Sequence, residues 1–310
     1  MGSMSSRTNW LLFLLLGFLW GSSYIFIKIG VEAGLTPFVL VSLRLLIGLA
    51  ILAAVVAAHR EPLPRSPKMY GHLAVLGAFS VAIPFFLITW AERHVESTIA
   101  ATITSAVPLF VIAIAAFALR DEPITANKLV GVGVGIVGVA ILVGFDPAAL
   151  AGGSLAAELA LVGATASYAI GGVYARRMVH SLRPMIPALF QVFFAFLMST
   201  ALAFVFERPL EAPITLETGF AVLWLGALGS GIAYLVFYRL LQAWGATRTS
   251  MVAYLLPIVG IALGALVLNE AVDARLIIGT ALIIGGIFVV NSRFGAGPLL
   301  RRDRSGAEAS

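Results

Sequence analysis

Long apolar stretches separated by short polar turns dominate the chain. A membrane hydrocarbon core of roughly 30 Å is crossed by a helix of about 20 predominantly apolar residues. Runs of that length predict ten membrane-spanning helices, at residues 10–31, 36–58, 69–91, 96–119, 125–145, 154–177, 184–206, 217–241, 246–268 and 273–292. Turns such as Glu122-Pro123 and Asp146-Pro147 separate them. The pattern therefore predicts an all-α polytopic membrane protein.

Composition indicates the same class. The chain is 60% hydrophobic and 11% charged, whereas soluble domains are roughly 45–50% apolar and about 25% charged. It contains no cysteine, which excludes disulfides, thiolate metal sites and thiol nucleophiles. The first span continues toward the second without a small-residue cleavage site, so we expect a retained helix and not a signal peptide.

The positions of lysine and arginine predict the orientation. With the N-terminus in the cytoplasm, 15 of the 20 Lys and Arg residues fall in inner segments and 3 in outer ones, while Lys28 and Arg44 lie within spans. Cytoplasmic loops of membrane proteins are enriched in these residues. We therefore expect a multi-pass protein of the plasma (inner) membrane with both termini cytoplasmic.

One sequence phrase occurs twice. Residues 76–86 read LGAFSVAIPFF, and residues 225–235 read LGALGSGIAYL, 149 positions later. The same offset relates Pro108 to Pro257, and Ser23 in the first span corresponds to Ser167 in the sixth. Each repeat contains five helices, an odd number, so the second copy crosses the membrane in the opposite sense. Inverted repeats are typical of secondary transporters, which hold their substrate near the midplane; a channel or a membrane enzyme is the alternative class.

The expected domains follow from this duplication. Residues 1–9 are an N-terminal tag and cytoplasmic end, in which MGS before Met4 has the form of an expression scar. Residues 10–145 are the first repeat, residues 154–292 the second, and residues 293–310 a basic cytoplasmic tail.

Several segments together resemble a known family. They are LWGSSYIFIK in the first span, SLRLL in the second, AVPLF in the fourth, GSGIAYLVFY in the eighth, and YLLPIVGIALGALVLNEAV in the ninth. The chain resembles the drug/metabolite transporter (DMT) superfamily, EamA branch, over nearly all ten helices, and within it is similar to the YddG-type exporters of aromatic and other amino acids. The resemblance implies a DMT/EamA-like fold and export of small metabolites, most of all amino acids.

Hydroxyl and aromatic side chains gather near the centres of several spans. Ser and Thr in membrane helices commonly bond to their own or a neighbouring helix, and aromatic stripes commonly pack. Their occurrence at one depth in both halves nevertheless favours a substrate cavity. In the third span, Phe79, Ile83, Phe86 and Trp90 have the spacing of one helical face. The candidate cavity residues are Trp20, Ser22, Ser23, Tyr24, Arg44, Phe79, Ser80, Thr102, Ser105, Ser167, Tyr168, Ser230, Tyr234 and Tyr254.

Two prolines and two charges stand out within the spans. Pro108 and Pro257 lie near span centres, where proline removes a backbone hydrogen bond, so each is either a structural kink or a gating hinge. Lys28 is expected to reach the lipid headgroups. Arg44 lies deeper and is either a ligand for a substrate carboxylate or a packing residue bonded to carbonyls or to Glu32.

The spans contain no carboxylate or histidine near their centres, which argues against metal binding and proton coupling. The acidic residues and histidines fall in loops, tails or helix ends, so we expect no metal site and facilitated transport by alternating access rather than proton coupling. A GxGxxG pattern at residues 133–138 lies inside an apolar span and is expected to serve helix packing. We therefore expect no enzyme activity, no cofactor and no nucleic acid, but a small-molecule substrate, the lipid bilayer and a homo-oligomer through the fifth and tenth spans as partners. An exporter of drugs or other neutral metabolites is the alternative within the transporter class.

Overall fold

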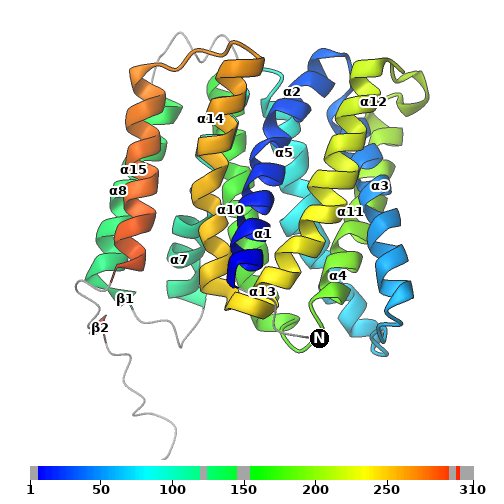
Figure 1. Ribbon diagram of the computed structural model, residues 1–310, viewed down its shortest axis with the longest axis horizontal. Coiled ribbons are helices and arrows are strands. Elements are labelled where there is room, and N and C mark those ends of the chain that lie inside the picture. Colours follow the sequence, from blue (N-terminus) through cyan, green and yellow to red (C-terminus); the bar gives the residue numbers. More distant parts are fainter. Residues whose placement is uncertain (1–5, 119–123, 145–153, 293–297, 301–310) are drawn as a thin grey trace, which may run out of the picture.

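The computed structural model describes residues 6–118, 124–144, 154–292 and 298–300. In this part of the chain, ten helical segments are long and apolar enough to cross a membrane. They match the ten predicted spans, and the largest difference is four residues, because the eighth span ends at Gly245 and not at residue 241. Figure 1 shows the spans side by side in one bundle. The prediction of a polytopic α-helical membrane protein is confirmed.

The first half of the chain forms five spans. The first consists of α1 (Ser6–Gly21) and α2 (Ser23–Glu32), and the second is α3 (Pro37–Ala58). The third contains α4 (Pro67–Gly77), the π-helical segment η1 (Ala78–Ala82) and α5 (Ile83–Ala91). The fourth contains α6 (Ser97–Thr104) and α7 (Val107–Ala118), and the fifth is α8 (Ala126–Val143). Proline opens α3 and α4, where its missing N–H costs no helical hydrogen bond.

The second half repeats this arrangement. The sixth and seventh spans are α10 (Ser154–Met178) and α11 (Met185–Phe206), followed by the 3₁₀ turn η2 (Pro209–Glu211). The eighth contains α12 (Leu216–Leu223), the π-helical segment η3 (Trp224–Ile232) and the part of α13 (Ala233–Ser250) up to Gly245, where the helix is interrupted with φ 76°. The ninth continues through the 3₁₀ turn η4 (Met251–Tyr254) into α14 (Leu255–Val267), and the tenth is α15 (Ala274–Asn291).

The spans run between two ends of the bundle. We call the end at which α1 begins the proximal end (lower edge of Figure 1) and the opposite one the distal end. At the proximal end, the short strands β1 (Ile124–Thr125) and β2 (Pro298–Leu300) pair antiparallel. The sequence did not predict this small sheet, because two or three residues leave no recognisable alternation of polar and apolar positions.

The duplicated phrase forms a π-helical turn in each half of the chain. η1 lies within the first copy, and η3 begins one residue before the second copy and ends inside it. A π turn holds one residue more than an α turn, and such turns are frequent at functional sites. η1 packs against α10 and α11, whereas η3 packs against α2 and α3. Each π turn therefore contacts the first two spans of the other half, as two inverted repeats require.

The two prolines lie next to breaks at equivalent places. α6 ends at Thr104 and α7 begins at Val107, so the fourth span is interrupted immediately before Pro108. In the ninth span, the change from η4 to α14 occurs at Leu255, just before Pro257. Proline has no N–H to donate to the carbonyl four residues earlier, so the helical ladder is weakest there.

Glycine brings the fifth and tenth spans together at one edge of the bundle (Figure 1). A Cβ on Gly131 would lie 2.5 Å from the carbonyl oxygen of Gly286, and a Cβ on Gly138 would lie 2.8 Å from that of Gly279. The residue pairs show that α8 and α15 run antiparallel. Gly131, Gly135 and Gly138 thus serve close helix packing between the two halves, as predicted, whereas a Cβ on Gly133 would meet nothing within 4 Å.

Candidate substrate site

A buried arginine lies where the two halves meet. Arg44 on α3 is 3% exposed. Its Nε donates a hydrogen bond to the Ser230 hydroxyl in η3 at 3.3 Å, and its guanidinium carbon lies 4.2 Å from the ring centroid of Phe85 on α5. Among the described residues no carboxylate forms an ion pair with it. Of the alternatives for Arg44, a bond to Glu32 is therefore wrong, because Glu32 pairs with Lys28 at 3.5 Å.

The π turn of the second half makes room for this guanidinium. Gly229 lies in η3, and a Cβ there would be 3.0 Å from the Ser23 hydroxyl oxygen and 3.5 Å from Nη2 of Arg44. Glycine thus lets α2, α3 and η3 converge on one point. The convergence brings a hydroxyl from each half next to one positive charge.

Aromatic side chains of both halves surround Arg44. Tyr24 shares a hydrogen bond of 2.5 Å with Thr104 at the break of the fourth span. The rings of Phe85 and Tyr168 meet edge to face at 6.5 Å, and those of Trp20 and Tyr234 at 6.2 Å. Tyr24 and Tyr234 are buried, whereas Trp20 and Tyr168 are half-buried. The result is an aromatic wall next to a cation.

The small hydroxyls mostly bond to backbone carbonyls. Ser23 donates to Leu19 at 2.9 Å, Thr102 to Thr98 at 2.8 Å, and Ser105 to Thr102 at 2.7 Å, each within its own helix. Such bonds satisfy a hydroxyl in an apolar environment without any ligand. The donor of each of these three hydroxyls is satisfied within its own helix, and each hydroxyl oxygen can still accept a hydrogen bond.

Two other hydroxyls connect helices. Ser167 on α10 donates to the carbonyl of Phe79 in η1 at 2.8 Å. Ser22 donates to Leu19 at 3.2 Å and accepts a hydrogen bond of 3.1 Å from the indole of Trp224. Ser80 in η1 is half-buried. These contacts place a serine of each first span against the π turn of the other half.

One candidate lies apart from the others. Tyr254 ends the 3₁₀ turn η4 and accepts a hydrogen bond of 3.3 Å from Asn291 on α15. Asn291 is the last residue of α15, which ends at the proximal end. The structure therefore brings Tyr254 next to the tenth span and not to Arg44.

Sequence reasoning missed Phe85. Of the predicted face, Ile83, Phe86 and Trp90 follow η1 in the regular helix α5, whereas Phe79 lies inside η1, so the extra residue of the π turn rotates these three relative to Phe79. Ile83 is 39% exposed, and Phe86 stacks on Phe38 at a centroid distance of 4.1 Å. Phe85 turns inward instead. The available signal was the duplicated phrase itself, which contains the π turn.

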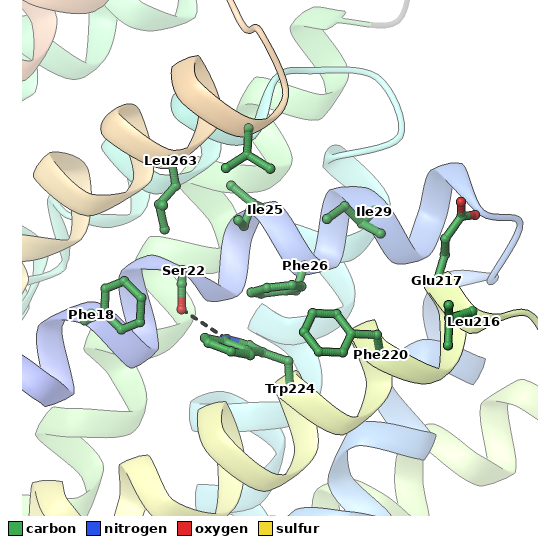
Figure 2. Close-up of a pocket in the computed structure, with 11 residues that line it drawn as sticks. Phe18, Ser22, Ile25, Phe26, Ile29, Leu216, Glu217, Phe220, Trp224 and Leu263 are labelled. Atoms are coloured by element: carbon green, nitrogen blue, oxygen red, sulfur yellow. Dashed lines mark hydrogen bonds between the residues drawn. The ribbon is translucent and has the colours of Figure 1, made fainter.

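A peripheral groove lies on another face of the bundle. Its volume is about 580 Å³, and α2, α12, η3 and α14 line it with apolar side chains such as Phe26, Phe220 and Leu263. Figure 2 shows Ser22 and Trp224 hydrogen-bonded on its wall. Ser22 alone among the candidate cavity residues lines this groove. In this conformation Arg44 and its neighbours are enclosed by the bundle.

The sequence profile of the EamA-like transporter family matches residues 8–144 and, a second time, residues 155–292. A solved crystal structure of a protein that is 24% identical superposes with a TM-score of 0.66, over 92% of this chain and 97% of that one. It shows the same fold.

Three relatives span most of the chain. A probable amino-acid metabolite efflux pump of Salmonella typhimurium is 26% identical over 295 residues, which cover 92% of this chain and 95% of that protein. The uncharacterized inner membrane transporter YedA of Escherichia coli K12 is 30% identical over 251 residues, covering 79% and 78%. The uncharacterized transporter YoaV of Bacillus subtilis is 23% identical over 271 residues, covering 87% and 92%.

Proposed function

The chain belongs to the EamA-like transporter family, and we propose that it exports amino acids, aromatic ones among them, from a site centred on Arg44. The observation that carries this proposal is a buried guanidinium with no acidic partner among the described residues. An unpaired charge at membrane depth is costly, and intramembrane charges commonly mark substrate pathways. A substrate carboxylate is the group that would complete the pairing.

The surroundings of Arg44 fit the other end of such a substrate. Phe85, Tyr168 and Tyr234 offer aromatic surface, which suits a phenyl, indole or thioether side chain. Ser23 and Ser230 lie near the Arg44 guanidinium, and their hydroxyl oxygens can accept hydrogen bonds from an ammonium group. A zwitterion with an apolar side chain uses all three features at once. The name of the Salmonella typhimurium relative is consistent with this class of substrate.

Alternating access accounts for the paired breaks in the helices. The fourth and ninth spans are interrupted next to Pro108 and Pro257, and the third and eighth contain π turns. Segments on either side of such breaks can change their angle without disturbing complete helices. Rocking about these four places would open the Arg44 site to one end of the bundle at a time. The bias of Lys and Arg toward the proximal end supports assigning that end to the cytoplasm and export to the distal end.

The proposal needs no cofactor and no covalent chemistry. Among the described residues no group of three His, Asp or Glu side chains could hold a metal ion. Within the described part of the chain, no His, Asp, Glu or Lys is hydrogen-bonded to the hydroxyls near Arg44 to activate one of them as a nucleophile. An oligomer through the fifth and tenth spans would use their outer faces, because their glycine faces contact each other.

Counterflow in liposomes tests this function. Purified protein is reconstituted without ion or pH gradients, the vesicles are loaded with unlabelled amino acid, and uptake of labelled phenylalanine, methionine and threonine is followed. We expect saturable exchange that phenylalanine supports best. Linear uptake far faster than a carrier would indicate a channel, and chemical conversion of the label would indicate an enzyme. Absence of exchange with every amino acid would overturn the substrate class.

A further inference from the structure

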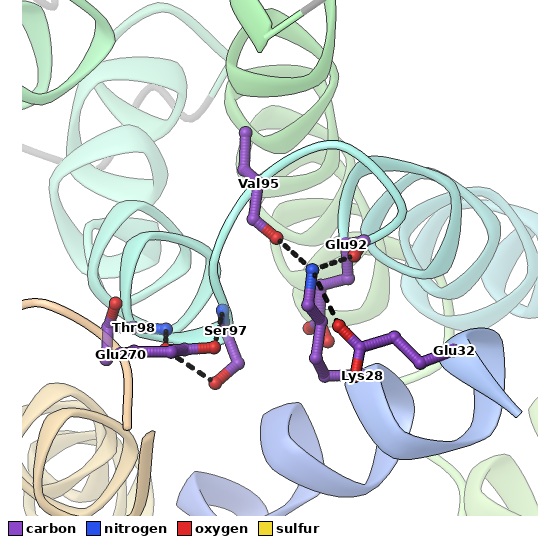
Figure 3. A network of polar contacts seen from close by, with 7 residues as sticks. All are labelled: Lys28, Glu32, Glu92, Val95, Ser97, Thr98 and Glu270. Atoms are coloured by element: carbon purple, nitrogen blue, oxygen red, sulfur yellow. Dashed lines mark hydrogen bonds and ion pairs between the residues drawn. The ribbon is translucent and has the colours of Figure 1, made fainter. Parts of the chain in front are cut away.

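Hydrogen bonds hold the distal loop between the third and fourth spans from two sides (Figure 3). On one side, Nζ of Lys28 on α2 donates hydrogen bonds to the carbonyl oxygens of Glu92 at 2.8 Å and Val95 at 3.0 Å. On the other, Glu270 accepts hydrogen bonds from the backbone N–H groups of Ser97 at 2.7 Å and Thr98 at 2.9 Å. The loop thereby joins the distal ends of the first, third, fourth and ninth spans.

Lys28 is therefore not the lipid anchor that the sequence analysis predicted. Its side chain is 16% exposed and points toward the loop (Figure 3). Snorkelling toward headgroups requires an open path along the helix, and the loop closes that path. Lys28 instead acts as a clamp on the distal end.

A buried carboxyl lies inside this closure. Glu92 follows α5 directly and is 0% exposed, and among the described residues neither of its side-chain oxygens has a hydrogen-bond partner. Lys28 bonds to the Glu92 backbone and pairs with the Glu32 carboxylate at 3.5 Å. The Glu92 side chain thus receives no hydrogen bond from the nearest cation. An ionised carboxylate in such a place is costly, and the neutral acid is the favoured form.

The charged groups around Glu92 have opposing effects on its pKa, and burial is the largest influence. Burial raises the pKa of the Glu92 carboxyl well above its usual range, Lys28 lowers it in part, and Glu270 raises it further. Arg44 on α3 and Glu32 on α2 have smaller opposing effects. On α10, which packs along α5, the nearest acid toward this end is Glu158, which is bound to Arg275 at 2.6 Å.

We propose that Glu92 is a proton-binding site that controls opening of the distal end, and with it the release of substrate. When the loop lifts, water reaches Glu92, the carboxyl ionises, and its proton leaves to the distal solution. Because the closed form has the raised pKa, the closed form is favoured at low pH, and opening becomes easier as pH rises toward that pKa. The effect of pH on opening of the loop does not depend on the proposed function; only its effect on the rate of transport rests on that function.

The repeat shows that this device is present at one end only. By the correspondence that relates Ser23 to Ser167 and Pro108 to Pro257, Lys28 corresponds to Gly172 and Glu92 to Leu241. Neither replacement can hold a charge or a proton. A proton bound and released at one end changes how fast that end opens but drives no net transport. The inference therefore agrees with facilitated export and adds control by the pH on the distal side.

Cysteine labelling tests the opening without any substrate. The chain has no cysteine, so Val95→Cys introduces a single thiol at a buried position of the loop. Ile214→Cys, at a position that is 99% exposed, reports the intrinsic pH dependence of thiol reactivity. The measured quantity is the maleimide labelling rate at Val95→Cys divided by that at Ile214→Cys. We expect this ratio to rise with pH, by up to about tenfold per unit between the closed and open pKa values.

Two further variants identify the proton site. Adding Glu92→Gln, a permanently neutral side chain of the same size, should hold the ratio at its low-pH value at every pH. Glu96→Gln is the matched control, because Glu96 lies in the same loop and its side chain caps no helix; it should keep the pH dependence of the parent. A ratio that does not change with pH, or an unchanged dependence in Glu92→Gln, would overturn the proposal.

Infrared spectroscopy separates the proton from any folding defect. At pH values above the usual range of a glutamate, the parent protein should show the C=O stretch of a protonated carboxyl that is missing in Glu92→Gln and present in Glu96→Gln. In liposomes, counterflow should slow at low pH in the parent and be slow and independent of pH in Glu92→Gln. If labelling and infrared behave as expected while no amino acid is exchanged, the gate stands and the proposed substrate fails.

Discussion

Replacing Arg44 by glutamine should remove most of the affinity for a carboxylate substrate. The variant keeps a polar side chain next to Ser230 and loses the charge over Phe85. A hydrogen bond to a charged group contributes about 1.5–3 kcal/mol. At about 1.4 kcal/mol for each factor of ten, the half-saturation concentration for phenylalanine should rise about 10- to 100-fold.

A substrate without a carboxylate provides the decisive comparison. Phenethylamine has the ring and the ammonium group of phenylalanine but nothing for Arg44 to bind. Its ability to inhibit phenylalanine counterflow in the parent protein is compared with its inhibition of residual counterflow in Arg44→Gln. The two inhibition constants should agree within a few-fold, while the value for phenylalanine changes strongly.

The control variant is Arg93→Gln, which removes an exposed arginine in the distal loop. It should leave both ligands unaffected. Equal losses for phenylalanine and phenethylamine in Arg44→Gln would mean that Arg44 only holds the helices together. No loss for either ligand would refute the reasoning altogether.

Three further perturbations test the helix breaks and the contacts between the halves. Pro257→Ala restores a backbone N–H beside the break in the ninth span, so maximal counterflow should fall while the half-saturation concentration changes little; unchanged turnover removes the gating role. Glu270→Gln removes the charge that caps α6, which should lower the free energy of unfolding by about 0.5–2 kcal/mol in thermal denaturation; an unaltered melting temperature contradicts it. Gly131→Ala places a Cβ 2.5 Å from the Gly286 carbonyl oxygen and should destabilise the protein, whereas Gly133→Ala meets nothing within 4 Å and should be neutral or stabilising. Equal melting temperatures for this pair would contradict the close packing of α8 on α15.

The fold was predictable because its signals are local or periodic. Ten apolar runs of sufficient length predict ten spans, and the odd number of spans per repeat predicts inversion. Gly131, Gly135 and Gly138 of the fifth span share one helical face, which predicted close helix packing there, and α15 occupies that face. Each of these inferences needs only distance along the chain and the geometry of a regular helix.

The candidate site was predictable only in part. Arg44 was singled out because a charge inside an apolar run is conspicuous by itself, and Tyr24, Ser230 and Tyr234 lie in the same region. Phe85 was missed because a π turn shifts the helical phase by one residue, and period counting assumes a regular helix. Tyr254 was placed in the cavity because depth in the membrane was counted along the chain, whereas η4 carries it to Asn291.

The sequence alone determined that the chain crosses the membrane ten times, that it does so as two inverted copies, and that an arginine lies within one span. Only the tertiary structure decided which side chains face that arginine and which charges are withdrawn from water. Glu92 and Glu96 are both helix-end acids in the sequence, yet Glu92 is fully buried while Glu96 is half-buried. The physical reason is that burial and pairing depend on contacts between segments far apart in the chain, such as Lys28 with the loop at Glu92. No pattern of neighbouring residues encodes those contacts.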